Sequence, residues 1–258
     1  AGIAIFNNAT PTNFTLAKRL DAVGSTNEAN TLYREGGGYP TISPLSIEYS
    51  FGRNLVTGLP RDTGDNATDF LFSDTSAMSA GAGQRLGAPG PENLTSPIQR
   101  NATVKASLVD PGAGSTAPPN RVRDATANVC GGPNCTLGTL DIRRKFTNNT
   151  GAAVTRLRFR IVDITSASAP VGTADLRALT GLDVTVSLTG GGTTLVRGLT
   201  LETPPAQANG GALNSTVTAG IVTLGTPIAN GASINVRFLL GVQQAGAFRF
   251  FVNVEALP

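Results

Sequence analysis

The chain has 258 residues, which suits one large β domain or two smaller ones with a buried core. Charged residues make up only 14% of it, while 31 glycines and 16 prolines favour many short strands joined by turns over long helices. The net charge of +3 is too small to indicate nucleic-acid binding, and no run reaches the roughly 20 apolar residues of a membrane-spanning helix. We therefore expect an all-β fold, an antiparallel β-sandwich or jelly roll with long Gly/Pro-rich loops, that binds no nucleic acid and has no membrane span.

The first predicted element is a short apolar strand at the N-terminus, which ends before two asparagines. A strand at a chain end can add to the sheet edge of the next molecule, where Ile3 and Ile5 would set the register and main-chain hydrogen bonds would give strength. Such a contact propagates into a filament. The alternative is that the strand pairs within its own domain. The predicted donor strand consists of Gly2, Ile3, Ala4, Ile5 and Phe6.

Residues 31–59 carry short strand signals between glycine and proline breaks, and residues 75–135 are the least regular part of the chain. The acidic loop from Asp62 to Asp69 gathers oxygen ligands of the kind that Ca²⁺ prefers, but its spacing is not that of an EF-hand, and a solvated turn is the favoured interpretation. We predict an N-terminal strand plus a loop-rich β region over residues 1–135 and a regular antiparallel region over residues 136–258, or one continuous domain.

The two cysteines of the chain, Cys130 and Cys135, enclose a Gly-Gly-Pro-Asn segment that allows a tight turn. We expect a disulfide that fixes this turn and adds little to the stability of the whole fold, because the closed loop is short. The alternative is two free thiols in a reducing compartment. With no histidine in the chain, two cysteines are too few for a zinc site.

From residue 136 onward, apolar and polar residues alternate clearly. Residues 140–146 and residues 157–161 alternate on either side of a turn signal at residues 148–151, which predicts a hairpin with one apolar and one cationic face. Because like charges side by side are destabilising, a carboxylate on a third strand, an acidic face of a neighbouring subunit or an anionic polymer should offset them. The candidate interface residues are Arg143, Lys145, Arg156, Arg158 and Arg160.

The rest of the C-terminal half continues this pattern. Residues 182–189 and 194–201, joined by three glycines, predict a second hairpin, and residues 217–224, 234–242 and 248–254 complete the series. Turn signals about every 10 residues are typical of a sandwich or jelly roll.

The sequence Asn-x-Thr occurs eight times, which is typical of an N-glycosylated, exported protein. The alternative is that Asn and Thr simply share turns. Because the chain begins at Ala1 and not at Met, we also expect that a signal peptide has been removed. The candidate glycosylation sites are Asn13, Asn66, Asn93, Asn101, Asn148 and Asn214.

The chain contains no histidine, which removes Ser-His-Asp and Cys-His catalysis and histidine metal sites. No glycine-rich loop is followed by the Lys-Ser/Thr of a phosphate cradle. We therefore predict a protein that is not an enzyme and uses no cofactor.

Two segments, residues 144–165 and residues 238–257, resemble parts of large, uncharacterised secreted bacterial surface proteins, and the likeness covers roughly residues 90–258. The resemblance implies an exported β-sandwich with a repetitive or surface role, and it supplies no catalytic residues. Similarity to donor-strand fibre subunits is one of design only.

These observations lead to one expected function and two alternatives. We expect a structural subunit of an extracellular or cell-surface assembly, a pilus-like homopolymer of the chain that carries N-linked glycans. The alternatives are an adhesion or ligand-binding module and a shell subunit of a surface layer or capsid.

Overall fold

The computed structural model describes residues 1–40, 49–54, 61–76, 85–89, 103–166 and 173–258. Strands make up 46% of the chain and helices 7%, which confirms the all-β fold. The helical part of the described residues consists of α1 (Asn66–Asp69) and four single 3₁₀ turns, η1 (Pro11–Asn13), η2 (Leu16–Lys18), η3 (Thr31–Tyr33) and η4 (Pro133–Cys135). No helix in this part of the chain is long and apolar enough to cross a membrane.

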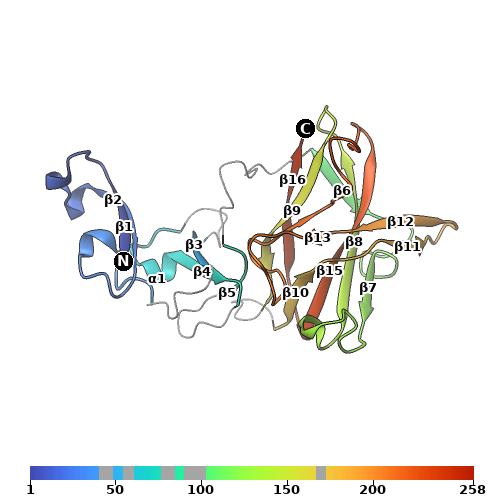
Figure 1. Ribbon diagram of the computed structural model, residues 1–258, viewed down its shortest axis with the longest axis horizontal. Helices are drawn as coiled ribbons and strands as arrows, with labels where there is room; N and C mark the ends of the chain where they lie inside the picture. Colours follow the sequence, from blue (N-terminus) through green and yellow to red (C-terminus); the bar gives the residue numbers. More distant parts are fainter. Residues whose placement is uncertain (41–48, 55–60, 77–84, 90–102, 167–172) are drawn as a thin grey trace.

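The N-terminal part, residues 1–40 together with the loop of residues 61–69 that carries α1, forms a small lobe set apart from a larger sandwich along the longest axis of the molecule (Figure 1). Its sheet is the N-terminal hairpin, in which β1 (Gly2–Phe6) pairs antiparallel with β2 (Arg19–Gly24). A three-stranded middle sheet follows, made of β3 (Tyr49–Arg53), β4 (Phe70–Asp74) and β5 (Arg85–Leu86). The ring of Tyr39 stacks on Phe51 of β3 with 4.0 Å between centroids, and this contact ties the lobe to the middle sheet.

The sandwich consists of two sheets that face each other (Figure 1). The larger sheet has the order β11 (Val184–Ser187), β12 (Thr193–Gly198), β15 (Ser233–Gln244), β8 (Thr139–Asn148), β6 (Val104–Leu108), with β10 (Asp175–Leu179) on β15 and β7 (Arg121–Asp124) on β8. The smaller sheet has the order β13 (Thr200–Leu201), β14 (Thr216–Thr218), β9 (Arg156–Ile164), β16 (Phe250–Leu257).

The core of the sandwich lies between these sheets and is built from the inward residues of alternating strands. Phe146 of β8 and Phe159 of β9 come from opposite sheets, and their ring centroids are 4.7 Å apart. Phe238 of β15 closes the cluster edge-to-face, 5.1 Å from Phe159. All three rings are buried, and they belong to the apolar cluster between the two sheets.

The predicted hairpin of residues 140–161 is wrong, because β8 and β9 belong to different sheets. Each strand has one apolar face, and the two faces bury more area when they pack face to face than they would side by side. Residues 149–155 therefore cross from one sheet to the other. The second predicted hairpin is confirmed, since β11 pairs antiparallel with β12.

The sandwich begins earlier in the chain than the regular pattern of residues 136–258 indicated. Strands β6 and β7, which precede residue 136, both pair antiparallel with β8. A disulfide joins Cys130 and Cys135 just before β8, as the tight turn predicted. The cysteine loop is therefore a connection inside the sandwich.

Candidate functional site

The N-terminal strand pairs within its own chain, which was the alternative to a free donor strand. In the N-terminal hairpin Ile3 lies opposite Val23 and Ala4 opposite Ala22, and a bulge follows Ile5. Within the described residues, nothing pairs with the other edge of β1. The strand is thus an edge strand of a two-stranded sheet.

Small residues hold the inner face of the hairpin against the η3 turn. Gly2 and Gly24 lie opposite each other. A Cβ atom added to Gly2 would lie 2.0 Å from the carbonyl oxygen of Tyr33, and one added to Gly24 would lie 2.3 Å from the same oxygen. Only glycine fits at either position, because the backbone of η3 lies directly on the sheet.

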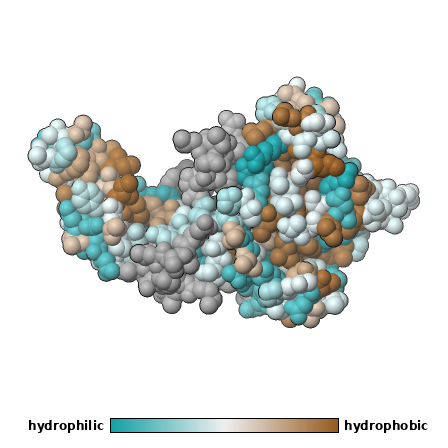
Figure 2. Space-filling model, in the orientation of Figure 1, coloured by the Kyte–Doolittle hydropathy of each residue, from teal (hydrophilic) through white to brown (hydrophobic). Residues whose placement is uncertain are grey.

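The outer face of the hairpin is apolar and faces solvent. Ile3 is 67% exposed and Ile5 is 63% exposed, although both are β-branched residues that usually pack against a neighbour. Figure 2 shows hydrophobic surface on the part of the lobe that carries β1 and β2. An edge strand with exposed apolar side chains is a site where another chain can pair.

The register also identifies the peptide groups that face the unpaired edge of β1. The amide of Ser25 donates to the carbonyl of Ala1 at 3.3 Å, so residues 1, 3 and 5 form the hydrogen-bonded pairs with β2. The peptide groups of Gly2 and Ala4 therefore point away from β2. They are the donors and acceptors that a further strand would use.

The side chain of Asn66 locks the opposite edge of β2. Its Oδ1 atom accepts hydrogen bonds from the amides of Gly24 and Glu35, both at 2.9 Å, and its Nδ2 atom donates to the carbonyl of Ala22 at 2.7 Å. Asn66 is fully buried. One amide side chain on α1 thus takes the place of a third strand beside β2.

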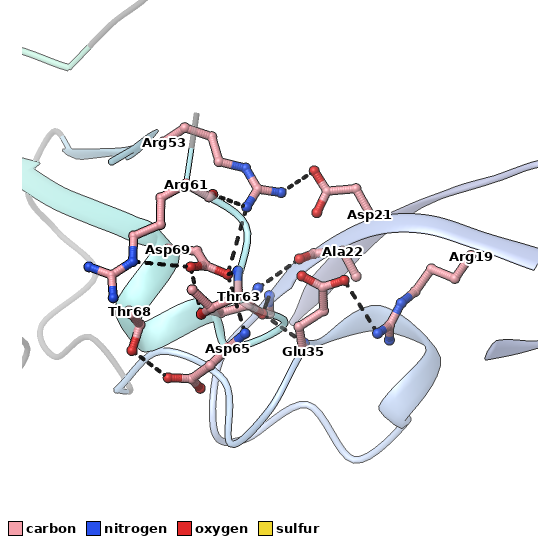
Figure 3. A network of polar contacts seen from close by, with 12 residues as sticks. Arg19, Asp21, Ala22, Glu35, Arg53, Arg61, Thr63, Asp65, Thr68 and Asp69 are labelled. Carbon is pink, nitrogen blue, oxygen red and sulfur yellow. Dashed lines mark hydrogen bonds and ion pairs between the residues drawn. The ribbon is translucent and has the colours of Figure 1, made fainter. Parts of the chain in front are cut away.

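A buried carboxylate organises the loop that carries α1 (Figure 3). Asp69 accepts hydrogen bonds from the amide and hydroxyl of Thr63, at 2.7 and 2.8 Å, and from the amide of Asp65 at 3.2 Å. Burial raises the pKa of Asp69, but these hydrogen bonds and the charge of Arg53 outweigh it and leave the pKa below its usual value. The acidic loop is therefore a polar core of the lobe, and the expectation of a solvated turn is wrong at Asp69.

Three carboxylates of this region, those of Glu35, Asp62 and Asp69, have oxygen atoms within 4.8 Å of one another. Arginines lie among them: Arg53 bridges Asp21 and Asp69, Arg61 approaches Asp69 at 3.8 Å, and Arg19 lies 3.4 Å from Glu35 (Figure 3). Burial, followed by the charge of Asp21, raises the pKa of Glu35. Because guanidinium groups already supply positive charge here, the cluster works as a salt-bridge network, and we assign it no metal.

The predicted cationic stripe is divided between the two sheets, because β8 and β9 are not neighbours. Arg143 of β8 is buried and donates two hydrogen bonds to Asp141, at 2.9 and 2.7 Å. Lys145, on the same strand, is half-buried. The arginines of this strand therefore do not join those of β9 in one interface.

The arginines of β9 have carboxylate partners within the chain. Arg158 is buried 2.8 Å from Glu202 and 3.8 Å from Glu255, Arg160 lies 3.0 Å from Glu255, and Arg156 lies 3.5 Å from Glu202. Of the three predicted ways to offset the charge, the structure shows carboxylates within the chain: Glu255 on the neighbouring strand β16 and Glu202 just after β13. Sequence reasoning missed both glutamates because they lie more than 40 residues away along the chain.

The candidate glycosylation sites differ in their accessibility. Asn13 is exposed at the end of η1, and Asn214 is half-buried. Asn66 and Asn148 are buried, and the side-chain amide nitrogen of each donates hydrogen bonds to backbone carbonyls. Neither nitrogen is accessible for modification in the folded chain, so the prediction is corrected at both positions. Asn93 and Asn101 lie outside the described residues.

No family model matches the chain, and neither the curated proteins nor the solved structures contain a match.

Proposed function

We propose that the chain is a structural subunit of an extracellular assembly, in which the β1 edge of one copy adds to the β11 edge of the next copy and builds a filament. The observation that carries this proposal is the position of two strand edges that have no partner among the described residues. Strand β1 lies at one end of the longest axis, and β11 lies in the hairpin that projects at the other end (Figure 1). A head-to-tail contact between opposite ends repeats without closing.

The receiving edge resembles β1 in length and in its position at the edge of a sheet. Strand β11 has four residues, β1 has five, and β11 is the outermost strand of the larger sheet within the described residues. The amide of Leu188 donates to the carbonyl of Gly192 at 3.1 Å, so the register leaves the peptide groups of Thr185 and Ser187 pointing outward. Both residues are exposed.

Exposed apolar side chains flank the β11 edge as well. Leu182 precedes β11 and is 81% exposed, and Leu195 of β12 lies opposite Thr185 with its side chain partly exposed. In an antiparallel junction the peptide groups of Gly2 and Ala4 meet those of Thr185 and Ser187, which places Ile3 and Ile5 of the incoming β1 on the face of β11 that carries Val184 and Val186. The contact is a β-augmentation made by a strand that stays paired with β2.

The size of the contact predicts a weak single junction. Four intermolecular hydrogen bonds contribute about 2–6 kcal/mol. Covering Ile3 and Ile5, which are 67% and 63% exposed, contributes about 2–4 kcal/mol. Association itself costs roughly 4–15 kcal/mol. We therefore expect filaments at high local protein concentration and monomers in dilute solution.

The disulfide and the exposed sequon support an extracellular location. A Cys130–Cys135 bond persists in oxidising compartments and is rare in the cytosol. Asn13 lies on the surface of the lobe, close in the chain to the hairpin, and a glycan there would remain exposed.

The proposal is tested by replacing both exposed isoleucines. The double substitution Ile3→Thr and Ile5→Thr keeps β-branched side chains and therefore keeps the hairpin, but it removes most of the apolar area that the junction buries. We expect it to raise the concentration needed for assembly at least tenfold, measured by sedimentation velocity and negative-stain electron microscopy. Leu224, which is 86% exposed and belongs to the segment between β14 and β15, provides the matched control Leu224→Thr.

Two results would contradict the proposal. Assembly of the double variant at the wild-type concentration would exclude β1 from the junction. A wild-type protein that stops at dimers, whatever its concentration, would show a closed contact in place of a propagating one.

A further inference from the structure

A cavity of about 290 Å³ lies in the sandwich, at the end that carries β7 and β10. Its floor is apolar and comes from inward-facing side chains of the larger sheet and the loop before β16, namely Leu140, Leu176, Val242 and Phe248. In the sheet register Leu176 lies opposite Val242, and Leu140 lies opposite Arg123. The apolar floor and the cationic side therefore belong to one face of one sheet.

Two arginines of β7, Arg121 and Arg123, form one side of this cavity. Arg123 donates to the carbonyls of Leu137, Thr139 and Asp124, which fixes its position. Arg121 is half-buried, and within the described residues its guanidinium has no hydrogen bond and no ion pair. None of its guanidinium nitrogens is among the buried unpartnered atoms of the described residues, so the group is open to solvent and can pair with an anion.

The surroundings make the cationic side stronger. Arg144 of β8 lies close by, and among the described residues its guanidinium donates only to carbonyl oxygens, those of Asn120 and Arg143. Burial, followed by the positive charge of Arg121, lowers the pKa of Arg144. The residues that line the cavity include no aspartate or glutamate. The carboxylate of Asp124, the nearest acidic group on β7, accepts a hydrogen bond from the amide of Thr126.

We propose that this cavity binds a small carboxylate with an apolar body, the carboxylate pairing with Arg121 and the body lying on Leu140, Leu176, Val242 and Phe248. Arginine suits this role because its planar fork donates two parallel hydrogen bonds to a carboxylate. The volume corresponds to about ten water molecules at about 30 Å³ each, so a molecule with about ten non-hydrogen atoms fills it. A medium-chain fatty acid such as octanoate has this size and chemistry.

The proposal is independent of filament formation, because the cavity includes neither β1 nor β11. Isothermal titration of the full chain with octanoate, octan-1-ol and inorganic phosphate separates the two parts of the site. We expect octanoate to bind at least tenfold more tightly than octan-1-ol, which lacks the charge, and than phosphate, which lacks the apolar body. Absence of octanoate binding up to millimolar concentration would overturn the proposal, as would equal binding of octanoate and either other probe.

Substitutions at the cavity test whether octanoate binds there. Arg121→Met keeps the length of the side chain and removes its charge, and we expect it to weaken octanoate binding at least tenfold. Lys105→Met is the matched control, because Lys105 is exposed on β6 and the change in net charge is the same. Ala245→Phe adds volume at the cavity lining and should abolish binding without removing any core contact. Unchanged octanoate affinity in a folded Arg121→Met or Ala245→Phe variant would refute the assignment, and the comparison of the three probes on the wild type decides the matter if either variant fails to fold.

Discussion

Asn66→Ala is the substitution that tests most directly how the N-terminal lobe holds its hairpin. The side chain makes three buried hydrogen bonds, with the amides of Gly24 and Glu35 and with the carbonyl of Ala22. Alanine would leave two amides and one carbonyl without partners, and each orphaned group costs about 1–3 kcal/mol when buried. We expect a total loss of about 3–9 kcal/mol, concentrated in the lobe.

Two measurements separate this effect from a general loss of stability. Hydrogen exchange should accelerate at the amides of Gly24 and Glu35 and leave the β8 and β15 strands of the sandwich protected, because the lobe can open by itself. Denaturant unfolding should show the lobe melting before the sandwich. Asn13→Ala, at an exposed asparagine in the same lobe, is the matched control and should change stability by less than about 0.5 kcal/mol.

Unchanged protection of Gly24 in the Asn66→Ala variant would refute this reasoning. It would mean that the η3 turn and the salt bridges around Asp69 hold β2 in place without the amide.

Three further predictions concern packing and charge. Gly2→Ala should destabilise the lobe, because its Cβ would lie 2.0 Å from the Tyr33 carbonyl oxygen, whereas Gly37→Ala meets nothing within 4 Å and should be neutral; thermal melts compare the two. The folded chain lowers the pKa of Asp69, so Asp69→Asn should cost stability above the unfolded pKa, and this cost should vanish as the pH falls through the folded pKa. The folded chain raises the pKa of Glu35, so Glu35→Gln should stabilise the protein at pH 7 and lose that advantage in acid. Urea unfolding measured at a series of pH values checks both. Arg158→Met leaves Glu202 and Glu255 facing an uncharged side chain and should cost about 3–5 kcal/mol, and adding Glu255→Gln should recover part of this loss in a double-mutant cycle.

The sequence predicts those elements whose signal is local. Gly2–Phe6, the β11–β12 hairpin and the long β15 strand all follow from apolar runs, alternation with a period of two and glycine turns, which need no knowledge of distant residues. The Cys130–Cys135 bond follows from spacing alone. In each case the deciding residues lie within about 15 positions of one another.

Pairing between strands is less visible in the sequence, because an apolar face does not say what covers it. Strands β8 and β9 have the same alternation whether they lie side by side or face to face. In the folded chain they lie face to face, with Phe146 and Phe159 in contact across the core. The same limit explains the arginines of β9, whose partners Glu202 and Glu255 lie far away along the chain.

At Asn66 a local signal pointed away from the actual role. Asn-x-Thr favours a surface position, yet the fold uses the amide of Asn66 as a buried substitute for a strand edge. No local pattern distinguishes the two roles, because both depend on an amide that can donate and accept. The glycines at positions 2 and 24 are similar, since only the approach of Tyr33 explains them.

The central claim is that β1 of one copy pairs with β11 of the next, and mixing two edge variants tests it most directly. Proline is tolerated where an edge amide points outward, so Ala4→Pro should block β1 and Thr185→Pro should block β11 while each variant keeps its other edge intact. In sedimentation velocity we expect each variant alone to remain monomeric and an equimolar mixture to form heterodimers and nothing longer. Filaments formed by either variant alone, or a mixture that stays monomeric at a concentration where the wild type assembles, would contradict the account.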